Sequence, residues 1–313
     1  MKDDALAPVI AVMLILAAIV TFFSIYNAIY VPSMKESSEV EHIHNVESSF
    51  QKFSSDIYYA ASSHQNYLTF SEPVQLGGGD FMFNLLKSSG TLNVQNEENP
   101  IYNLSLTDET GAQVAFLNGT IVNFAYEPTS NFWQDQGYRW QYGYLNVTKY
   151  GSLSTPLQYT NMTSVNNAFN ESSPLASLAS SFGQVSYEVN TTPAADGTNP
   201  GGNCSSLDLW AVNITASPDH NFISSNGYGT LSLASSVNTT SYPGISSVAI
   251  DPDNEPFGNV TFGSWNTSIN AAAAACHNIE PDDSNTGQWD IKPWADRPVT
   301  VTLHEVHVEI STY

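Results

Sequence analysis

The most apolar part of the chain lies at its N-terminus. Residues 5–34 contain no charged side chain, and the Lys35-Glu36 pair follows them directly. A helix rises by about 1.5 Å per residue, so this stretch would be about 45 Å long, whereas the hydrocarbon core of a bilayer is about 30 Å thick. The pattern predicts a hydrophobic helix over residues 6–34 that is long enough to cross a membrane.

The next segment keeps a helical period but is apolar on one face only. Its apolar residues follow one another at spacings of three or four, at Val40, Ile43, Val46, Phe50, Phe53 and Ile57. Such a stripe is typical of a helix that packs one face against a protein core. Pro32 stands between the two segments and predicts a kink. We expect an amphipathic continuation over residues 35–61, with a coiled-coil stalk as the alternative.

From about Tyr67 the period changes from helical to alternating. Short runs of alternating apolar residues are separated by Gly, Pro and Asn, in the segments 122–126, 140–144, 185–189, 207–211, 231–233, 248–250, 260–262 and 299–303. This pattern predicts an antiparallel β-sandwich or jelly-roll head over residues 62–313. The expected fold class is therefore mainly β with a long N-terminal α-helix.

Smaller features interrupt the alternation. Ser173-Pro174 is typical of a helix start and predicts a helix to Phe182, and Thr267 or Ser268 is expected to begin another that ends at Cys276. Glycine and proline predict a loop over residues 191–202 and a turn over residues 77–79. In the last strand the apolar parity changes between Leu303 and Val306, which predicts a β-bulge near His304-Glu305.

The first ten residues carry a family resemblance. The sequence Asp4-Ala5-Leu6-Ala7-Pro8-Val9-Ile10, after a leader of residues 1–5, resembles the N-terminal segment of archaeal type IV pilins and pilin-like surface proteins. The resemblance implies that a peptidase cuts near Asp4, Ala5 and Leu6 and that the retained helix packs into the core of a filament. The implied assembly face is formed by Pro8, Val9, Ile10, Val12, Ile15 and Leu16.

The chain departs from many type IV pilins at one position. They carry a glutamate five residues after the cut, where this chain has Val9 and Ile10. The departure weakens what the resemblance implies about how one subunit docks on the next. A plain single-pass membrane anchor is the alternative interpretation of the same residues.

Charge and composition indicate an extracellular head. The chain has 8 Lys and Arg against 30 Asp and Glu, a net charge of −22. Phosphate contacts need clustered cations, so nucleic acid is not an expected partner. Eleven Asn-x-Ser/Thr sequons are candidate glycosylation sites: Asn103, Asn118, Asn146, Asn161, Asn170, Asn190, Asn203, Asn213, Asn238, Asn259 and Asn266. We expect a cell-surface protein that is anchored in the membrane before assembly.

The two cysteines, Cys204 and Cys276, lie on the same side of the apolar segment. In an oxidising compartment they are expected to form a disulfide, and two separate buried thiols are the alternative.

Catalytic and metal-binding motifs are weak. His304-Glu305-Val306-His307 has an unsuitable spacing for zinc, because residues three apart on a strand face opposite sides. Residues 251–255 (Asp-Pro-Asp-Asn-Glu) are either a partial calcium loop or a solvated acidic turn. Neither a nucleophile elbow nor a phosphate-binding loop occurs, so we expect no enzyme and no cofactor.

An aromatic-rich stretch offers a candidate recognition surface. Trp133, Trp140 and Tyr142 are suited either to stacking on a sugar or protein partner or to packing in the core.

Taken together, these features predict a pilin-like structural subunit whose partners are copies of itself or other pilins, bound through the N-terminal helix. The alternative is a monomeric membrane-anchored module that binds a surface glycan or an envelope protein.

Overall fold

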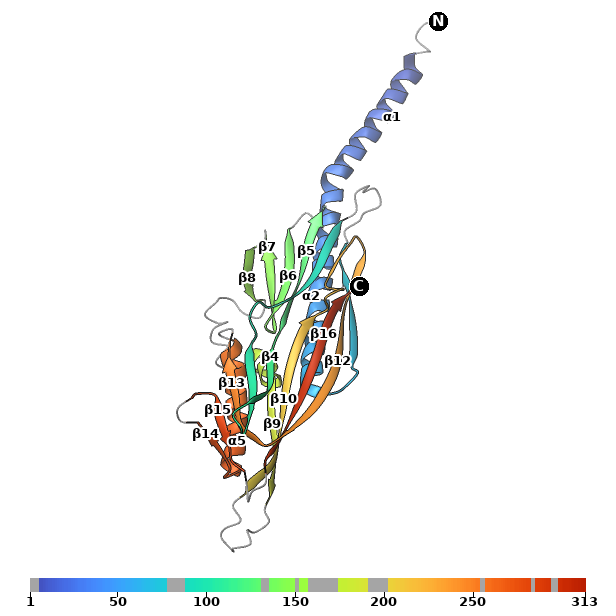
Figure 1. Cartoon of the computed structure of the whole chain (residues 1–313). Helices are drawn as coiled ribbons and strands as arrows, with labels where there is room; N and C mark the ends of the chain where they lie inside the picture. Colours follow the sequence, from blue (N-terminus) through green and yellow to red (C-terminus); the bar gives the residue numbers. More distant parts are fainter. Residues whose placement is uncertain are drawn as a thin grey trace, which may run out of the picture.

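A long helical rod enters a head made of three β-sheets in the computed structural model (Figure 1). The structure describes residues 6–77, 88–130, 135–149, 152–156, 174–190, 202–253, 257–282, 285–293 and 298–313. The rod consists of α1 (Leu6–Ile25), the π-helical turn η1 (Tyr26–Tyr30) and α2 (Val31–Ser63). The predicted fold class, mainly β with an N-terminal helix, is confirmed. The predicted turn at 78–79 and loop at 191–201 lie outside the described residues.

Pro32 is accommodated without breaking the rod. It lies in the first turn of α2, where its missing N–H and bulky ring disturb the preceding turn. That turn is π-helical, and the Val31 N–H donates to the Tyr26 carbonyl five residues earlier. In place of a break at Pro32, the irregularity lies one turn earlier, where α1 leans away from the line of α2 (Figure 1).

In the part of the chain that the structure describes, the head contains three sheets of five, six and five strands. The first has the order β1-β12-β16-β10-β9, over Thr69–Gln75, Tyr228–Pro243, Thr300–Thr312, Asn203–Ala216 and Gly183–Asn190. The second has the order β11-β2-β5-β6-β7-β8, over Phe222–Ser225, Ser89–Asn96, Val122–Ser130, Gln136–Gln141, Tyr144–Lys149 and Ser152–Pro156. The third has the order β14-β15-β13-β3-β4, over Ile279–Pro281, Gln288–Ile291, Ile245–Pro252, Tyr102–Asp108 and Gln113–Gly119. One pair, β10 with β16, is parallel, which the antiparallel prediction did not include.

The second half of the rod is part of the head core. Four residues of the predicted stripe, Val46, Phe50, Phe53 and Ile57, are fully buried. The rings of Phe50 and Phe53 lie 4.9 and 5.4 Å from the ring of Phe124 on β5. The predicted burial of Val40 is wrong, because that side chain is 57% exposed.

The buried stripe is rotated at its N-terminal end. Glu39 and His42 occupy the buried positions there, and the sequence 39, 42, 46, 50, 53 and 57 keeps a strict three- or four-residue spacing. Val40 lies one position, about 100° of helix rotation, away from that stripe. Because the prediction counted apolar residues only, it placed the wrong face of α2 against the head at this end.

The predicted bulge in β16 is absent, although the parity change is real. β16 pairs with β10 and β12 through residues 304–305 without a register shift. Both β10 and β16 bury one face in one half and the opposite face in the other, and the switch falls where Ala211 pairs with Glu305 and Val212 with Val306. The apolar positions change parity because one face of this regular sheet is buried along the first half of the two strands, and the opposite face along the second half.

Two predicted strands were assigned wrongly, and the reasons are local. Residues 260–262 belong to α5 (Phe257–Ala275), which begins well before the predicted Thr267. Phe257, Thr261, Trp265 and Ile269 are buried at four-residue spacing, a helical stripe that contains one threonine. The run 140–144 is interrupted by a hairpin turn, because Tyr142 and Gly143 both have positive φ. The helix predicted from Pro174 is present as α4 (Pro174–Ser181).

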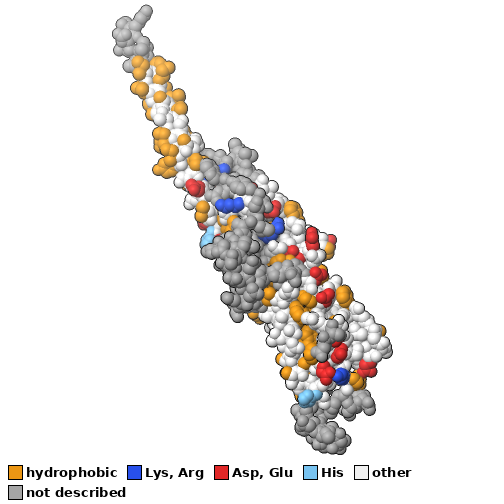
Figure 2. Space-filling view, turned by 90° about the vertical axis from the view of Figure 1, so that its left-hand side faces the viewer, with side chains coloured by type: hydrophobic (Ala, Val, Ile, Leu, Met, Phe, Trp, Pro, Cys, Tyr) orange, Lys and Arg blue, Asp and Glu red, His pale blue; other side chains and the backbone are white. Residues whose placement is uncertain are grey.

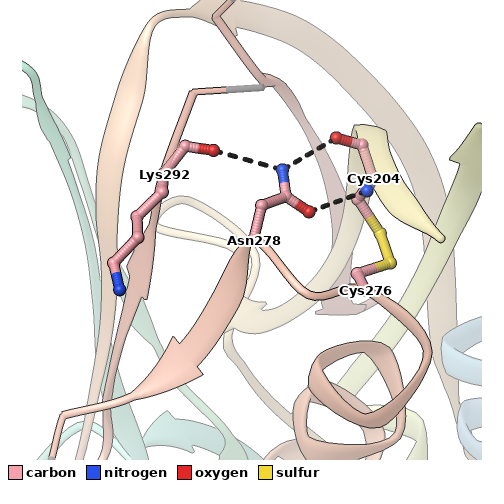
Figure 3. The surroundings of a disulfide bond; sticks show 4 residues. All are labelled: Cys204, Cys276, Asn278 and Lys292. Carbon is pink, nitrogen blue, oxygen red and sulfur yellow. Dashed lines mark hydrogen bonds between the residues drawn. A yellow bond between two sulfur atoms is a disulfide. The ribbon is translucent and has the colours of Figure 1, made fainter. Parts of the chain in front are cut away.

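The predicted disulfide is present and joins the start of β10 to the end of α5 (Figure 3). The Cα atoms of Cys204 and Cys276 are 5.3 Å apart. Asn278 supports the bridge: its side chain accepts a hydrogen bond from the Cys204 N–H at 2.8 Å and donates to the Cys204 and Lys292 carbonyls at 3.0 and 3.1 Å.

Replacing both cysteines by alanine should destabilise the head. The bridge closes a sequence separation of 72 residues, and loops of that size are worth about 4 kcal/mol in the chain-entropy model. Urea unfolding of the full chain in detergent, followed by tryptophan fluorescence, measures the loss. A change below about 1 kcal/mol would contradict the role given to the bridge.

Candidate functional site

The surface that stands out most is the whole circumference of α1. The four consecutive side chains of Val12, Met13, Leu14 and Ile15 are 60–67% exposed. Four consecutive helical residues point in four directions, so the helix is apolar on every side. Figure 2 shows this segment projecting beyond the head without acidic or basic side chains. The helix is long and apolar enough to cross a membrane.

The predicted assembly face is part of this larger surface. Pro8, Val9, Ile10, Val12, Ile15 and Leu16 are all exposed. So are Ile19, Val20, Phe22 and Phe23, which lie around and beyond that face. A helix that is apolar all round needs an apolar environment on all sides rather than along one seam. Asp4 and Ala5 of the predicted cleavage site lie outside the described residues, and Leu6 is the first residue of α1.

Two polar side chains in the N-terminal half of the rod bond to the helix itself. Thr21 Oγ1 donates to the Ala17 carbonyl at 2.7 Å, and Asn27 Nδ2 donates to the Phe23 carbonyl at 3.0 Å. An unpaired polar group in an apolar medium would cost several kcal/mol. These internal bonds therefore suit the helix to lipid or to a protein core.

Aromatic residues mark the end of the apolar part. The rings of Tyr26 and Tyr30 stack with centroids 5.9 Å apart, just after the 20 residues of α1. Twenty helical residues span about 30 Å, the hydrocarbon thickness of a bilayer, and tyrosine favours its boundary. Glu39 is the first residue of the rod that is buried in the head. The rod is thus divided into an apolar part, a short boundary part and a docked part.

A polar cluster fixes the rod where it enters the head. His42 Nε2 donates to the Gln75 carbonyl at the end of β1, 2.8 Å away, and the ring of His42 meets the edge of Tyr126. Burial lowers the pKa of His42, and the bond to Gln75 offsets part of that shift. Burial, and then the nearby Glu39, raise the pKa of the Tyr126 hydroxyl. Burial therefore favours the neutral imidazole of His42 more than in an exposed histidine. A histidine at a stripe position was the sequence signal for this cluster.

The far end of α2 is fixed by a stack of three rings. His64 has a left-handed backbone at the helix end, and its ring lies 4.3 Å from that of Trp210. Trp210 stacks in turn on His304 at 3.9 Å, and His304 Nδ1 lies 2.9 Å from Thr239 Oγ1. Burial lowers the pKa of both histidines. His304 therefore helps to hold the helix end against β10 and β16.

The candidate metal ligands do not converge. His307 bonds to Thr215 at 3.3 Å, and residues three apart on this unbulged strand face opposite sides, away from His304. Within the described ranges no cluster of three or more His, Cys, Asp or Glu could hold a metal ion. Asp251 lies at the end of β13, whereas Asn254 and Glu255 fall outside the described residues.

Of the three candidate recognition aromatics, one is buried and one is half-buried. Trp140 is 1% exposed, stacks on Phe124 and donates its indole N–H to Ser54 Oγ at 2.8 Å, so its predicted recognition role is wrong. Tyr142 is half-buried against Phe257. Trp133 lies outside the described residues. For Trp140, the alternative of core packing therefore holds.

The sequons differ in accessibility. Asn118, Asn238 and Asn259 are exposed, and Asn103, Asn203, Asn213 and Asn266 are partly exposed. Asn146 is buried, which conflicts with its predicted glycosylation. Asn161, Asn170 and the side chain of Asn190 lie outside the description.

Comparisons of the chain with protein-family models, with curated proteins and with solved structures find no match.

The docking of α2 should weaken in mild acid. The unfolded chain takes up a proton at His42 near its ordinary pKa of about 6.5, whereas the folded chain resists it, so stability falls as the pH drops below that value. His64 and His304 act in the same direction. His42→Gln should therefore flatten, but not abolish, the dependence of unfolding free energy on pH between about 7 and 5.

The matched control is His44→Gln, since the His44 side chain is 80% exposed. Chemical denaturation at several pH values gives, for each variant, the slope of unfolding free energy against pH. These slopes are compared, and the absolute stabilities are not. Equal slopes for native, His42→Gln and His44→Gln proteins would show that His42 does not couple protonation to folding.

Proposed function

We propose that this chain is a pilin-like structural subunit of an archaeal cell-surface filament. One observation carries the proposal: a helix with apolar side chains exposed all round continues without interruption into a helix that forms part of the head core. The apolar part needs an apolar environment on every side, and neighbouring copies of the same helix would provide it. The head is then held at a fixed distance from the filament axis.

Side-chain size on α1 is compatible with close helix packing. Ala11 and Ala18 are exposed and lie two helical turns apart on the same face. Between helices that leave lipid there is little hydrophobic driving force, so association depends on van der Waals packing, which small residues improve by letting backbones approach. Large exposed side chains such as Leu14 and Phe22 would then fill the spaces between neighbouring helices.

Charge along the rod supports the same arrangement. Cleavage near Leu6 would remove Lys2, Asp3 and Asp4, and the next charged residue is Lys35. A trimmed helix would therefore carry no side-chain charge into the filament core, where an unpaired charge would be costly. The acidic heads, with most of the net charge of −22, would face water.

The alternative, a membrane-anchored binding module, uses the same helix as a simple anchor. Its expected aromatic site is no longer available at Trp140, which is buried. The observation that supports the structural subunit over this alternative is the helix that is apolar on every side.

The proposal predicts a trimmed N-terminus and a polymer. Mass spectrometry of protein sheared from cells should give a mature chain that begins near Leu6, and electron microscopy of that fraction should show filaments labelled by an antibody to the head. Val12→Asp should still insert in the membrane, because one central aspartate costs about 2.5–3.5 kcal/mol against a strongly apolar helix, but it should abolish filaments.

Phe222→Asp is the matched control, because it places the same charge on an exposed apolar residue of the head. It should leave filament number unchanged. An intact Met1 together with single dispersed particles would overturn the proposal and leave a membrane anchor.

A further inference from the structure

A groove lined by polar and apolar side chains lies between strand β4 and strands β12 and β16. It has a volume of about 300 Å³, at the lower end of the range for ligand pockets. Residues 114–117 of β4 form one wall, Asn238, Thr240 and Tyr242 of β12 form the other, and Leu303 and Glu305 of β16 complete the lining. Val114 and Phe116 are 40% and 59% exposed.

β4 is also a free sheet edge. It pairs with β3 on one side, and among the described residues no strand pairs with its other side. The remaining edge strands carry a charge or a proline or are very short: Glu72 and Pro73 in β1, Glu188 in β9, Pro156 in β8, Glu280 and Pro281 in β14, and four residues in β11. β4 has seven residues and carries no charge or proline, and its one irregularity is the register shift at Val114, near its start. Since a free edge of this kind invites pairing with other chains, proteins normally block or cover it.

Two of the three exposed sequons described above lie at this groove. Asn118 directly follows the lining residue Leu117 on β4 and shares a face with Phe116, and Asn238 forms part of the opposite wall. Both are exposed, and within the described structure neither side-chain amide makes a hydrogen bond. Each Nδ2 atom is therefore free to carry a sugar.

The chemistry of the groove fits a carbohydrate. Phe116 and Tyr242 line the groove, and the face of an aromatic ring has a negative electrostatic potential that attracts the C–H groups on the apolar side of a sugar ring. Thr240 and Glu305 offer hydroxyl and carboxylate groups for sugar hydroxyls. A second copy of the chain fits less well, because it brings another net charge of −22 to a groove whose one charged side chain is acidic.

We propose that N-linked glycans on Asn118 and Asn238 occupy this groove and cover the free edge of β4. The inference rests on the extracellular head of the proposed function, but not on filament assembly. It assigns these two sequons a role that the other exposed sequon, Asn259 on α5, does not share.

Glycopeptide mass spectrometry of protein purified from its own cells tests the attachment. Asn118 and Asn238 should both carry glycans. Unmodified asparagine at both positions would overturn the inference, whether or not Asn259 is modified. The proposed function is tested separately, by the N-terminus and by microscopy.

Paired Asn118→Gln and Asn238→Gln substitutions test the covering role in the full chain in detergent. The paired variant should bind an apolar-surface dye several-fold more strongly and form larger species in sedimentation velocity, since an apolar edge is uncovered. Asn259→Gln should behave like the native protein. Adding Val114→Lys to the paired variant should restore the native sedimentation, because a lysine blocks edge pairing.

Two results would refute the covering role. One is native sedimentation and dye binding by the paired variant. The other is cross-linking of a second head to a photoreactive residue at position 116 in the native protein, which would show that a protein strand occupies the groove.

Discussion

The structure depends on one helix meeting two different environments along its length. From Val46 to Ala61 its buried residues lie in the core of the head, and from Val9 to Ile25 its apolar residues have no cover in the chain. Because the helix is continuous, neither part can move without the other. The π-helical turn at residues 26–30 allows this continuity, since it absorbs the disturbance of Pro32 without ending the hydrogen-bonded rod.

Contacts at both ends of the docked segment hold the rod in register with the sheets. At its entry, His42 bonds to the end of β1, and at its end His64 stacks on Trp210. Between them, Phe50 and Phe53 supply the apolar contacts to β5. Polar and aromatic residues thus set the position of the helix, while aliphatic and aromatic burial supplies most of the stabilisation.

Sequence patterns predicted the helix, the fold class and most strands, because each of these depends on a local period. They were less successful where the answer depends on what covers an element. Val40 was assigned to the buried face and Glu39 was missed, since a buried carboxylate cannot be recognised without its neighbours. Residues 260–262 alternate like a strand, yet Thr261 completes a helical stripe. Trp140 lies in the core because α2 covers β6, a contact between segments far apart in sequence. The groove beside β4 likewise brings together three strands whose proximity no local pattern encodes.

The change of buried face along β10 and β16 has a consequence for how the head comes apart. These two strands supply side chains to one layer through Leu207 and Val301, and to a different layer through Ile214 and Val308. This pair of central strands therefore contributes side chains to the core from both faces of its sheet. If these two strands unfolded, buried side chains on both faces of the sheet would be exposed at once. The elongated head should therefore unfold in one cooperative step.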